Sequence, residues 1–249
     1  MKEFYTKWSD RTFPLQEKGV LVASDSTQEW LLPWWFENYQ KHNDLPVCFV
    51  DFGLSAPMKA WCKSKGDYIY LEVPDVFVAE KKVCTESDIL LWEEGYGKSF
   101  WESRNAWFKK PLACLQSCYQ KTLWVDSDCE IRGSLKPLFS MEIPFSGMMV
   151  NQDLEVNSGV ILFVYRSCLI EKWARLSLEN NKHYRGDQDI LADLLKKQEA
   201  ANLPLIYNHS RLLEDVPNVV VKHWHGANGK TVIAHQIHKK NLEIFDFSN

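Results

Sequence analysis

Short apolar, strand-like runs alternate with helical segments through the first part of the chain, and this order restricts the fold more than any other feature. The runs at residues 18–25, 47–50 and 68–71 are separated by helical patterns over 28–42 and 56–65. Strands joined through helices pair in parallel, and the helices cover the faces of the sheet. The sequence therefore predicts an α/β fold with a mixed, mainly parallel sheet flanked by helices.

The rest of the chain extends this pattern. We expect strands at 122–125, 147–150, 158–164 and 219–221, and helices at 111–120, 168–180 and 187–198. Residues 74–100 are rich in charged and turn-forming residues, so we expect an irregular excursion there. No internal repeat, low-complexity tract or linker interrupts the sequence, which predicts a single domain over residues 1–249.

Composition limits the classes of partner and compartment. The formal net charge is −4, whereas a general nucleic-acid binder needs a basic surface, so we expect no nucleic-acid partner. The seven cysteines are scattered without a Cys-x-x-Cys pair, which favours reduced thiols in the cytoplasm. The longest apolar run, Val160–Tyr165, is too short to span a bilayer, and the N-terminus lacks the apolar core of a signal peptide. We therefore expect a soluble, cytoplasmic protein without a transmembrane segment.

Two carboxylates follow the predicted strand at 122–125. Asp126 and Asp128 are separated by Ser127, so along an extended backbone both point to the same side. Carboxylates that face one way repel each other unless a cation lies between them. A hard divalent ion such as Mg²⁺ or Mn²⁺ prefers such oxygen ligands. The alternative is an Asp-rich turn after a strand, without a ligand.

Two further clusters have both a functional and a structural interpretation. At the end of the first strand, Ala23-Ser24-Asp25 could contact a nucleoside, or Asp25 could cap the helix that follows. Arg104 and Lys109 could bind a diphosphate, since arginine binds phosphate oxygens in a bidentate manner. They could equally belong to a solvated, charged helix face.

Three clusters in the second half of the chain are ambiguous in the same way. Asn157-Ser158-Gly159 could let a ligand approach the backbone, or could be a simple turn before a strand. Asp187 and Gln188 could contact sugar hydroxyls, or Asp187 could cap the helix that begins there. His223, His225 and Lys230 combine a metal-ligand chemistry with a phosphate-binding one, although a buried histidine can be purely structural.

The order of these motifs resembles that of nucleotide-sugar glycosyltransferases of the GT-A (Rossmann-like) fold, and in particular the retaining family of bacterial galactosyltransferases and glycogenin. The resemblance covers roughly residues 18–235. It implies the following roles: Ala23, Ser24 and Asp25 at the uracil, Asp126-Ser127-Asp128 as the Asp-x-Asp motif that holds Mn²⁺ on the nucleotide diphosphate, Asn157 beside the donor sugar, and Asp187 with Gln188 close to the anomeric centre.

The tail resembles the His-x-x-Gly-x-x-Lys motif of that family. The resemblance implies that His223 is the third metal ligand and that Gly226 and Lys230 contact the diphosphate. Here Gly226 and Lys230 are one residue further apart than in the family pattern, which leaves the choice between His223 and His225 open.

The resemblance implies a metal-dependent hexosyltransferase that moves a sugar from a nucleotide-diphosphate donor, expected to be UDP-linked, to a hydroxyl acceptor. Mn²⁺ or Mg²⁺ would be the cofactor, with Asp126, Asp128 and His223 as ligands and Arg104 and Lys230 assisting. The acceptor class, whether carbohydrate, lipid-linked or protein, stays open. Two other functions also stay open: a sugar nucleotidyltransferase and a non-catalytic glycan-binding protein.

Overall fold

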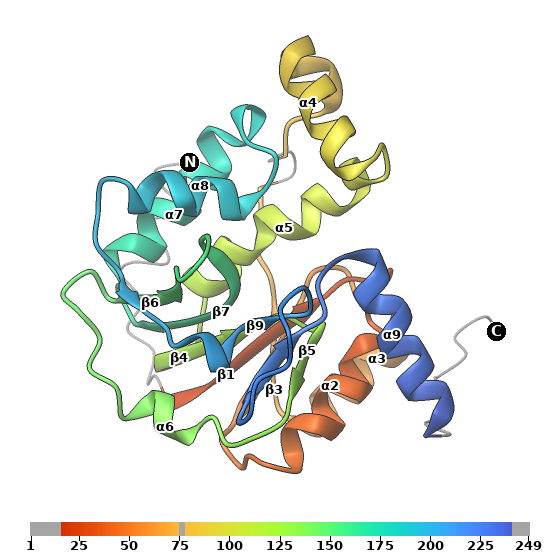
Figure 1. Cartoon of the computed structure of the whole chain (residues 1–249), viewed down its shortest axis with the longest axis vertical. Helices are drawn as coiled ribbons and strands as arrows, with labels where there is room; N and C mark the ends of the chain where they lie inside the picture. The colour runs from red at the N-terminus through yellow and green to blue at the C-terminus, as the bar shows by residue number, and fades with distance from the viewer. Residues whose placement is uncertain (1–15, 75–77, 241–249) are drawn as a thin grey trace.

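The computed structural model describes residues 16–74 and 78–240 of the chain. Its larger sheet has seven strands in the order β3-β2-β1-β4-β7-β6-β8 (Figure 1). The strands of this sheet are β1 (Gln16–Ser24), β2 (Val47–Asp51), β3 (Asp67–Tyr70), β4 (Tyr119–Val125), β6 (Met148–Asn151), β7 (Asn157–Val164) and β8 (Ala201–Asn202).

The predicted mixed, mainly parallel sheet is confirmed. Strands β3, β2, β1 and β4 pair in parallel, and β7 runs antiparallel to both of its neighbours, β4 and β6. β1 and β4 are direct neighbours, with Leu21 opposite Trp124. The carboxyl ends of these two strands therefore lie at the same edge of the sheet, so the residues after Ser24 and after Val125 can meet.

A second, smaller sheet lies beside the end of β4. It consists of β5 (Cys129–Ile131), β10 (Val221–His223) and β9 (His209–Ser210), with β10 in the middle. His223 of β10 pairs antiparallel with Cys129 of β5. Because β5 follows the Asp126–Asp128 turn directly, this pairing carries His223 to the carboxylates.

Helices cover both faces of the larger sheet. α5, α7 and α8 pack on the face that contains Leu21 and Trp124. α2, α3, α9 and the smaller sheet pack on the other face, which contains Val20 and Leu123. The bounds of the helices are α2 Leu31–Gln40, α3 Ala56–Lys65, α4 Glu86–Tyr96, α5 Phe100–Leu115, α6 Lys136–Phe139, α7 Cys168–Glu179, α8 Asp187–Leu195 and α9 Gly226–Lys239. None of the helices that the structure describes is long and apolar enough to cross a membrane.

Three predictions about elements were wrong. Residues 74–100 are not wholly irregular, because Thr85 caps a regular helix, α4, by accepting a hydrogen bond from the Asp88 amide. The helix predicted at 111–120 instead spans Phe100–Leu115, with Pro111 in its interior. Proline removes only one backbone hydrogen bond from a helix, and the buried Phe108 and Leu112 on either side hold α5 against the sheet. The strand predicted at 219–221 instead spans Val221–His223, and the helix that follows it, α9, was not predicted.

Candidate functional site

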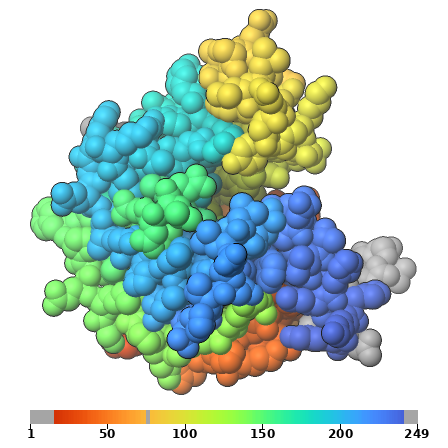
Figure 2. Space-filling model, viewed as in Figure 1, coloured from red at the N-terminus to blue at the C-terminus, as the bar shows by residue number. Residues whose placement is uncertain are grey.

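The candidate site lies beyond the carboxyl end of β4, where α5 and α9 converge on the Asp126–Asp128 turn. Lysines of both helices contact the two carboxylates. The molecular surface is notched between the lobe formed by α4 with the start of α5, in yellow, and α9, in dark blue (Figure 2). The turn itself is closed by a hydrogen bond from the Cys129 amide to the Asp126 carbonyl, 3.0 Å long, with Ser127 inside it.

Asp128 is the most enclosed of the acidic groups in this turn. One carboxylate oxygen lies 3.3 Å from His223 Nε2, and the other accepts a hydrogen bond of 3.3 Å from Lys230 Nζ. Burial opposes the charged form of Asp128, but His223 and Lys230 outweigh it and hold the pKa of this carboxyl well below its usual range. The structure thus brings together three residues that the sequence predicts for one site, although Asp128 and His223 are 95 positions apart in the sequence.

Asp126 lies next to Asp128 but has different partners. Its Oδ2 accepts a hydrogen bond of 2.9 Å from Lys110 Nζ, and its Oδ1 accepts one of 2.7 Å from the Trp124 indole. His223 Nε2 is 3.9 Å from the same Oδ2. Asp126 therefore faces the same imidazole as Asp128, and a buried lysine balances its charge.

Lys110 and Asn208 contact the site residues, although the sequence interpretation assigned neither of them a role. Burial would lower the pKa of Lys110, but the carboxylates of Asp126 and Asp187 raise it above its usual range, so the ammonium group is charged. In the sequence, Lys110 follows Arg104 and Lys109, and such charged side chains are typical of a solvated helix face. Asn208 gave no signal, because it is a single amide in a loop.

Asn208 fixes the orientation of the His223 ring. The Asn208 amide nitrogen donates to the Asn157 carbonyl and to Asn157 Oδ1, at 3.1 and 3.0 Å. Its oxygen is therefore left to accept from His223 Nδ1, at 3.0 Å. A proton held on Nδ1 leaves Nε2 free to act as a ligand, and outer partners of this kind orient metal-binding histidines.

The donor set of this site fits a divalent cation. Asp128, Cys129 and His223 each offer a ligand atom, and these atoms lie within 4.8 Å of one another. Burial raises the pKa of the Cys129 thiol well above its usual range, so it remains a neutral thiol and a poor ligand for a hard ion. Asp126 supplies the further oxygen that such an ion prefers.

Gly159 allows the His223 ring to lie on the backbone of β7. A Cβ atom at this position would lie 2.2 Å from His223 Cε1. We expect Gly159→Ala to displace the imidazole and to weaken Mn²⁺ binding about tenfold or more, the effect seen when the supports of a metal ligand are lost. Titration of Mn²⁺ monitored by calorimetry would measure this, with Gly133→Ala as the control because its Cβ would contact nothing closer than 3.4 Å. Unchanged affinity in Gly159→Ala would contradict the placement of His223.

Asp187, Gln188 and Asn157 gather around Ser158 at the start of β7. Asp187 accepts a hydrogen bond of 3.0 Å from the Ser158 hydroxyl, and Gln188 accepts one of 3.1 Å from the Ser158 amide. Lys110 Nζ lies 3.8 Å from Asp187 and 3.3 Å from the Ser158 carbonyl. Lys110 thus links these residues to Asp126.

Burial raises the pKa of Asp187 from 3.8 to about 6, despite the neighbouring Lys110. Because the folded-state pKa lies above the unfolded-state value, the native state binds this proton more tightly, and the resulting stabilisation is lost as the pH rises through about 6. The free energy of unfolding of Asp187→Asn, relative to the unmodified protein, should therefore rise by up to about 3 kcal/mol between about pH 4 and pH 7. Urea unfolding at both pH values would measure it. A difference that does not change with pH would contradict this assignment.

Ser24 and Asp25 lie where the sequence predicts, at the end of β1 beside β4. Asp25 Oδ1, however, accepts hydrogen bonds from the Thr27 amide and hydroxyl and from the Gln28 amide, at 2.9, 2.6 and 3.2 Å. This is the structural alternative that the sequence left open, in which the carboxylate orders the turn before α2. These bonds use only one oxygen of the carboxylate, and the turn that follows Asp25 is partly exposed.

The diphosphate contact predicted for Arg104 does not agree with its place in the structure. The residue is 1 % exposed, and its guanidinium donates hydrogen bonds to backbone carbonyls of the segments around it. The acceptors are the carbonyls of Ala79, Asn181, Tyr184 and Arg185, at 2.9, 2.7, 2.8 and 3.1 Å. These bonds occupy the donors that a phosphate would need, so the structure does not support the predicted diphosphate contact and gives Arg104 a structural role instead.

The structure separates the two histidines of the tail. His225 Nε2 is 2.7 Å from the Ser210 hydroxyl, and burial lowers the pKa of His225 to about 4. His223, rather than His225, is the histidine that contacts Asp128. Gly226 follows His225 directly and starts α9 with a φ of +77°, a left-handed conformation that favours glycine.

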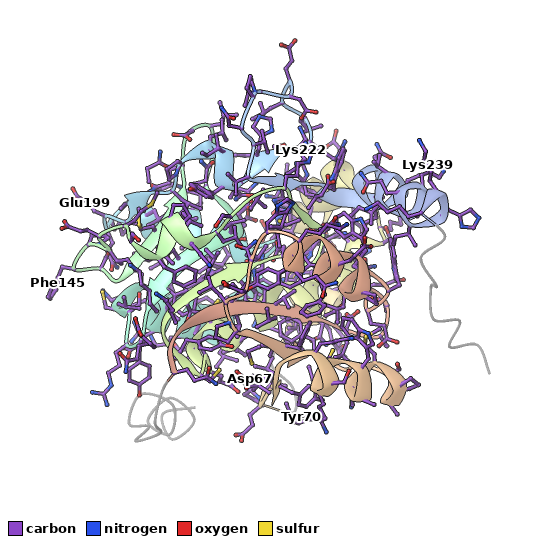
Figure 3. The ribbon with its side chains drawn as sticks, turned by 90° about the horizontal axis from the view of Figure 1, so that it is seen from below. Asp67, Tyr70, Phe145, Glu199, Lys222 and Lys239 are labelled. Carbon is purple, nitrogen blue, oxygen red and sulfur yellow. The ribbon has the colours of Figure 1, made fainter. Side chains whose placement is uncertain are left out.

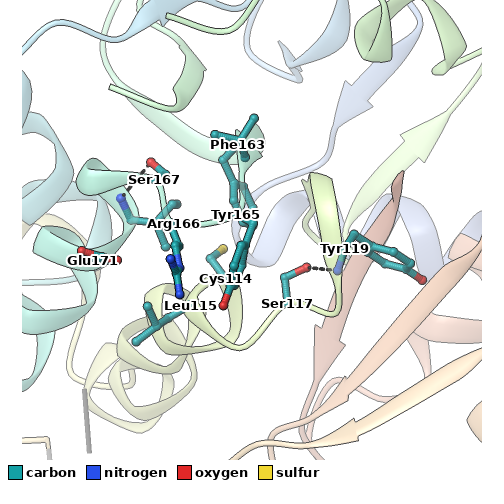
Figure 4. A pocket seen from close by; sticks show the side chains of 11 residues that line it. Cys114, Leu115, Ser117, Tyr119, Phe163, Tyr165, Arg166, Ser167 and Glu171 are labelled. Carbon is teal, nitrogen blue, oxygen red and sulfur yellow. Dashed lines mark hydrogen bonds between the residues drawn. The ribbon is translucent and has the colours of Figure 1, made fainter. Parts of the chain in front are cut away.

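A small cavity lies at the other end of β4, away from the candidate site. It is enclosed by the end of α5, the start of β4 and the turn after β7, with Cys114, Tyr119 and Arg166 among its lining residues (Figure 4). Tyr119 is the first residue of β4, whereas Asp126 follows its last residue. The cavity therefore lies at the opposite edge of the sheet from the carboxylates.

Comparison with known proteins identifies the fold. No family model and no curated protein matches this sequence. Among solved structures, the galactosyltransferase LgtC is similar over 88% of this chain and 95% of its own, with 16% identity and a TM-score of 0.54. The chain has the GT-A fold.

Two further glycosyltransferases share this GT-A fold. The glycosyltransferase GlyE of Streptococcus pneumoniae TIGR4 matches 91% of this chain with 15% identity and a TM-score of 0.54, and the match spans 65% of the GlyE chain. Mouse xyloside xylosyltransferase 1 matches 83% of this chain and 97% of its own, with 12% identity and a TM-score of 0.51. These matches confirm the GT-A fold that the order of motifs predicts.

Proposed function

We propose that this GT-A protein is a metal-dependent hexosyltransferase that moves a sugar from a UDP-linked donor to a hydroxyl acceptor. The observation that carries the proposal is the convergence of Asp126, Asp128, His223 and Lys230 beyond the carboxyl ends of two neighbouring parallel strands. Ligands of open α/β sheets bind at this edge. The glycosyltransferases that share the fold support the same reaction class.

Asp126, Asp128 and His223 would hold Mn²⁺ or Mg²⁺, and the bound ion would supply Lewis-acid stabilisation of the departing nucleotide diphosphate. The chain's own cations would act on the same group. Lys230 is 30 % exposed at its side chain and lies within reach of Asp128, so its ammonium can turn towards a phosphate oxygen. Gly226 leaves the start of α9 without a side chain that would block the approach of a phosphate.

The residues around Ser158 would orient the donor sugar. Asp187, Gln188 and Asn157 present carboxylate and amide groups, which suit the hydroxyls of a pyranose, and each is held by a hydrogen bond to β7 or to Asn208. Lys110 contacts both Asp126, a proposed metal ligand, and Asp187, a proposed sugar-binding residue, and so fixes their positions relative to each other. Ala23, Ser24 and Asp25 would bound the pocket on the nucleoside side.

A thermal-shift screen across UDP-, GDP- and other nucleotide sugars tests the proposal. We expect UDP-linked donors to raise the melting temperature only when Mn²⁺ is present, and we expect slow release of UDP from the best donor. Stabilisation by nucleoside triphosphates with release of pyrophosphate would instead indicate a nucleotidyltransferase. Glycan binding without metal-dependent nucleotide affinity would indicate a non-catalytic binding protein.

We also propose a cytoplasmic location. All seven cysteines are free thiols, and four of them, Cys48, Cys62, Cys114 and Cys129, are buried among the core residues. Free thiols in this number are typical of a reducing compartment.

A further inference from the structure

An exposed aromatic surface lies next to the candidate sugar-binding residues. Tyr96, at the end of α4, is 51% exposed, and its ring packs edge-on against Trp107 of α5, with centroids 6.5 Å apart and planes at 73°. The guanidinium of Arg185 lies 4.2 Å from the centre of the Tyr96 ring. We call Tyr96, Trp107, Arg185 and Asp189 the aromatic platform.

The platform is continuous with the candidate site through two contacts. Trp107 is three residues before Lys110 on α5, so both side chains lie on the same side of the helix. Trp107 also packs against Gly186, where a Cβ atom would lie 3.1 Å from the indole ring. The next residue is Asp187, whose carboxylate contacts Ser158. A ligand on the platform is therefore adjacent to the residues proposed to hold the donor sugar.

Polar groups on the platform are held in place before any ligand binds. Arg185 and Asp189 form an ion pair of 2.6 Å on successive turns, and each side chain is 30 % exposed. The backbone carbonyl of Arg185 accepts a hydrogen bond of 3.1 Å from the buried Arg104. Because Arg104 anchors this segment, the ion pair keeps a fixed position beside the rings.

This combination of groups matches the chemistry of a pyranose ring. The C–H groups on one face of a sugar pack on the electron-rich face of an aromatic ring, while its hydroxyls bond to charged side chains nearby. Arg185 lies over one face of the Tyr96 ring, and the exposed half of Tyr96 supplies the surface for the sugar. A purely apolar ligand would leave the partly exposed Arg185–Asp189 pair without a role. We propose that the aromatic platform binds the sugar ring of a carbohydrate acceptor. This inference rests on the proposed function and names the substrate class of the acceptor.

Saturation-transfer NMR with methyl β-galactoside, methyl β-glucoside and methyl β-lactoside as probes, in the presence of UDP and Mn²⁺, tests the inference. We expect ring-proton signals from at least one glycoside. Tyr96→Ala should weaken its binding at least about fivefold, whereas Tyr96→Phe should retain it because the ring is kept. Tyr96 is exposed, so neither substitution removes a core side chain.

Phe145→Ala is the matched control. Phe145 is a fully exposed aromatic residue just before β6, at the amino end of that strand and so at the opposite edge of the sheet from Asp126, and it projects from one side of the molecule (Figure 3). Glycoside binding should be unchanged in this variant.

The same samples separate this inference from the proposed function. If UDP binds with Mn²⁺ but no glycoside contacts the protein, or if Tyr96→Ala binds the glycosides as well as the unmodified protein, the platform is not the acceptor site and the proposed function stands. If UDP fails to bind with Mn²⁺, the proposed function is wrong whatever the glycosides do. Glycoside signals lost in Tyr96→Ala and in no control would support the platform.

Discussion

Asp128→Asn should reduce the affinity of the protein for Mn²⁺ and for UDP in the presence of Mn²⁺ by about 100-fold or more. Asparagine has the shape of aspartate but no charge, and the charge of the ligands determines how tightly a site binds a hard cation. Asp128 is also the carboxylate that contacts both His223 and Lys230. Loss of its charge therefore affects both the proposed metal ligand His223 and the proposed phosphate-binding Lys230. Donor turnover should fall by a similar factor.

Asp126→Asn should have an effect in the same direction, and Asp44→Asn should have none. Asp44 is an exposed aspartate that pairs with Lys136 at 2.8 Å, so its substitution changes the net charge equally without touching the site. Calorimetric titration of Mn²⁺ and UDP measures all three variants. Full metal-dependent donor turnover in both Asp126→Asn and Asp128→Asn would contradict the assignment of the metal ligands.

Arg104→Met should cause the largest loss of stability, about 4 kcal/mol or more. The substitution removes charge-assisted hydrogen bonds to four carbonyls, and it leaves these buried or partly buried acceptors without that donor. The guanidinium also lies 4.9 Å from the centre of the Trp101 ring and 5.4 Å from that of Trp92, contacts that methionine cannot reproduce in full.

Urea unfolding of Arg104→Met and of Arg175→Met would measure this effect. Arg175 is an exposed arginine on α7, so its substitution should change the free energy of unfolding by less than about 0.5 kcal/mol. If Arg104→Met were as stable as the control but had lost UDP affinity, the diphosphate role that the sequence suggested would be restored.

Arg104 and Lys110 of α5 show why part of the site could not be predicted from the sequence. Arg104 and Lys110 belong to the same short segment with Lys109, and the sequence gives no indication of which side chain faces solvent. In the structure both are buried, but Arg104 binds backbone carbonyls and Lys110 binds two carboxylates. The choice depends on the residues brought to α5 from residues 181–187, which are far from it in the sequence.

Local pattern predicted the elements with enough residues to show a period. α3 has the predicted bounds because Ser55 caps it and Pro57 lies in its first turn, and β7 begins within one residue of the prediction. The smaller sheet was not predicted as a unit. Its strands have two or three residues, too few to alternate visibly, yet it places His223 beside Asp128. The order of motifs along the chain indicated this proximity where periodicity could not.

Calorimetric titration of UDP into the protein with Mn²⁺, and again after chelation of the metal, is the most direct test of a metal-dependent donor site. We expect UDP to bind with Mn²⁺, and to bind about 100-fold or more weakly without it, because Asp126 and Asp128 then repel the diphosphate. Equal affinity with and without the metal, or no binding of UDP in either condition, would contradict the proposed donor site.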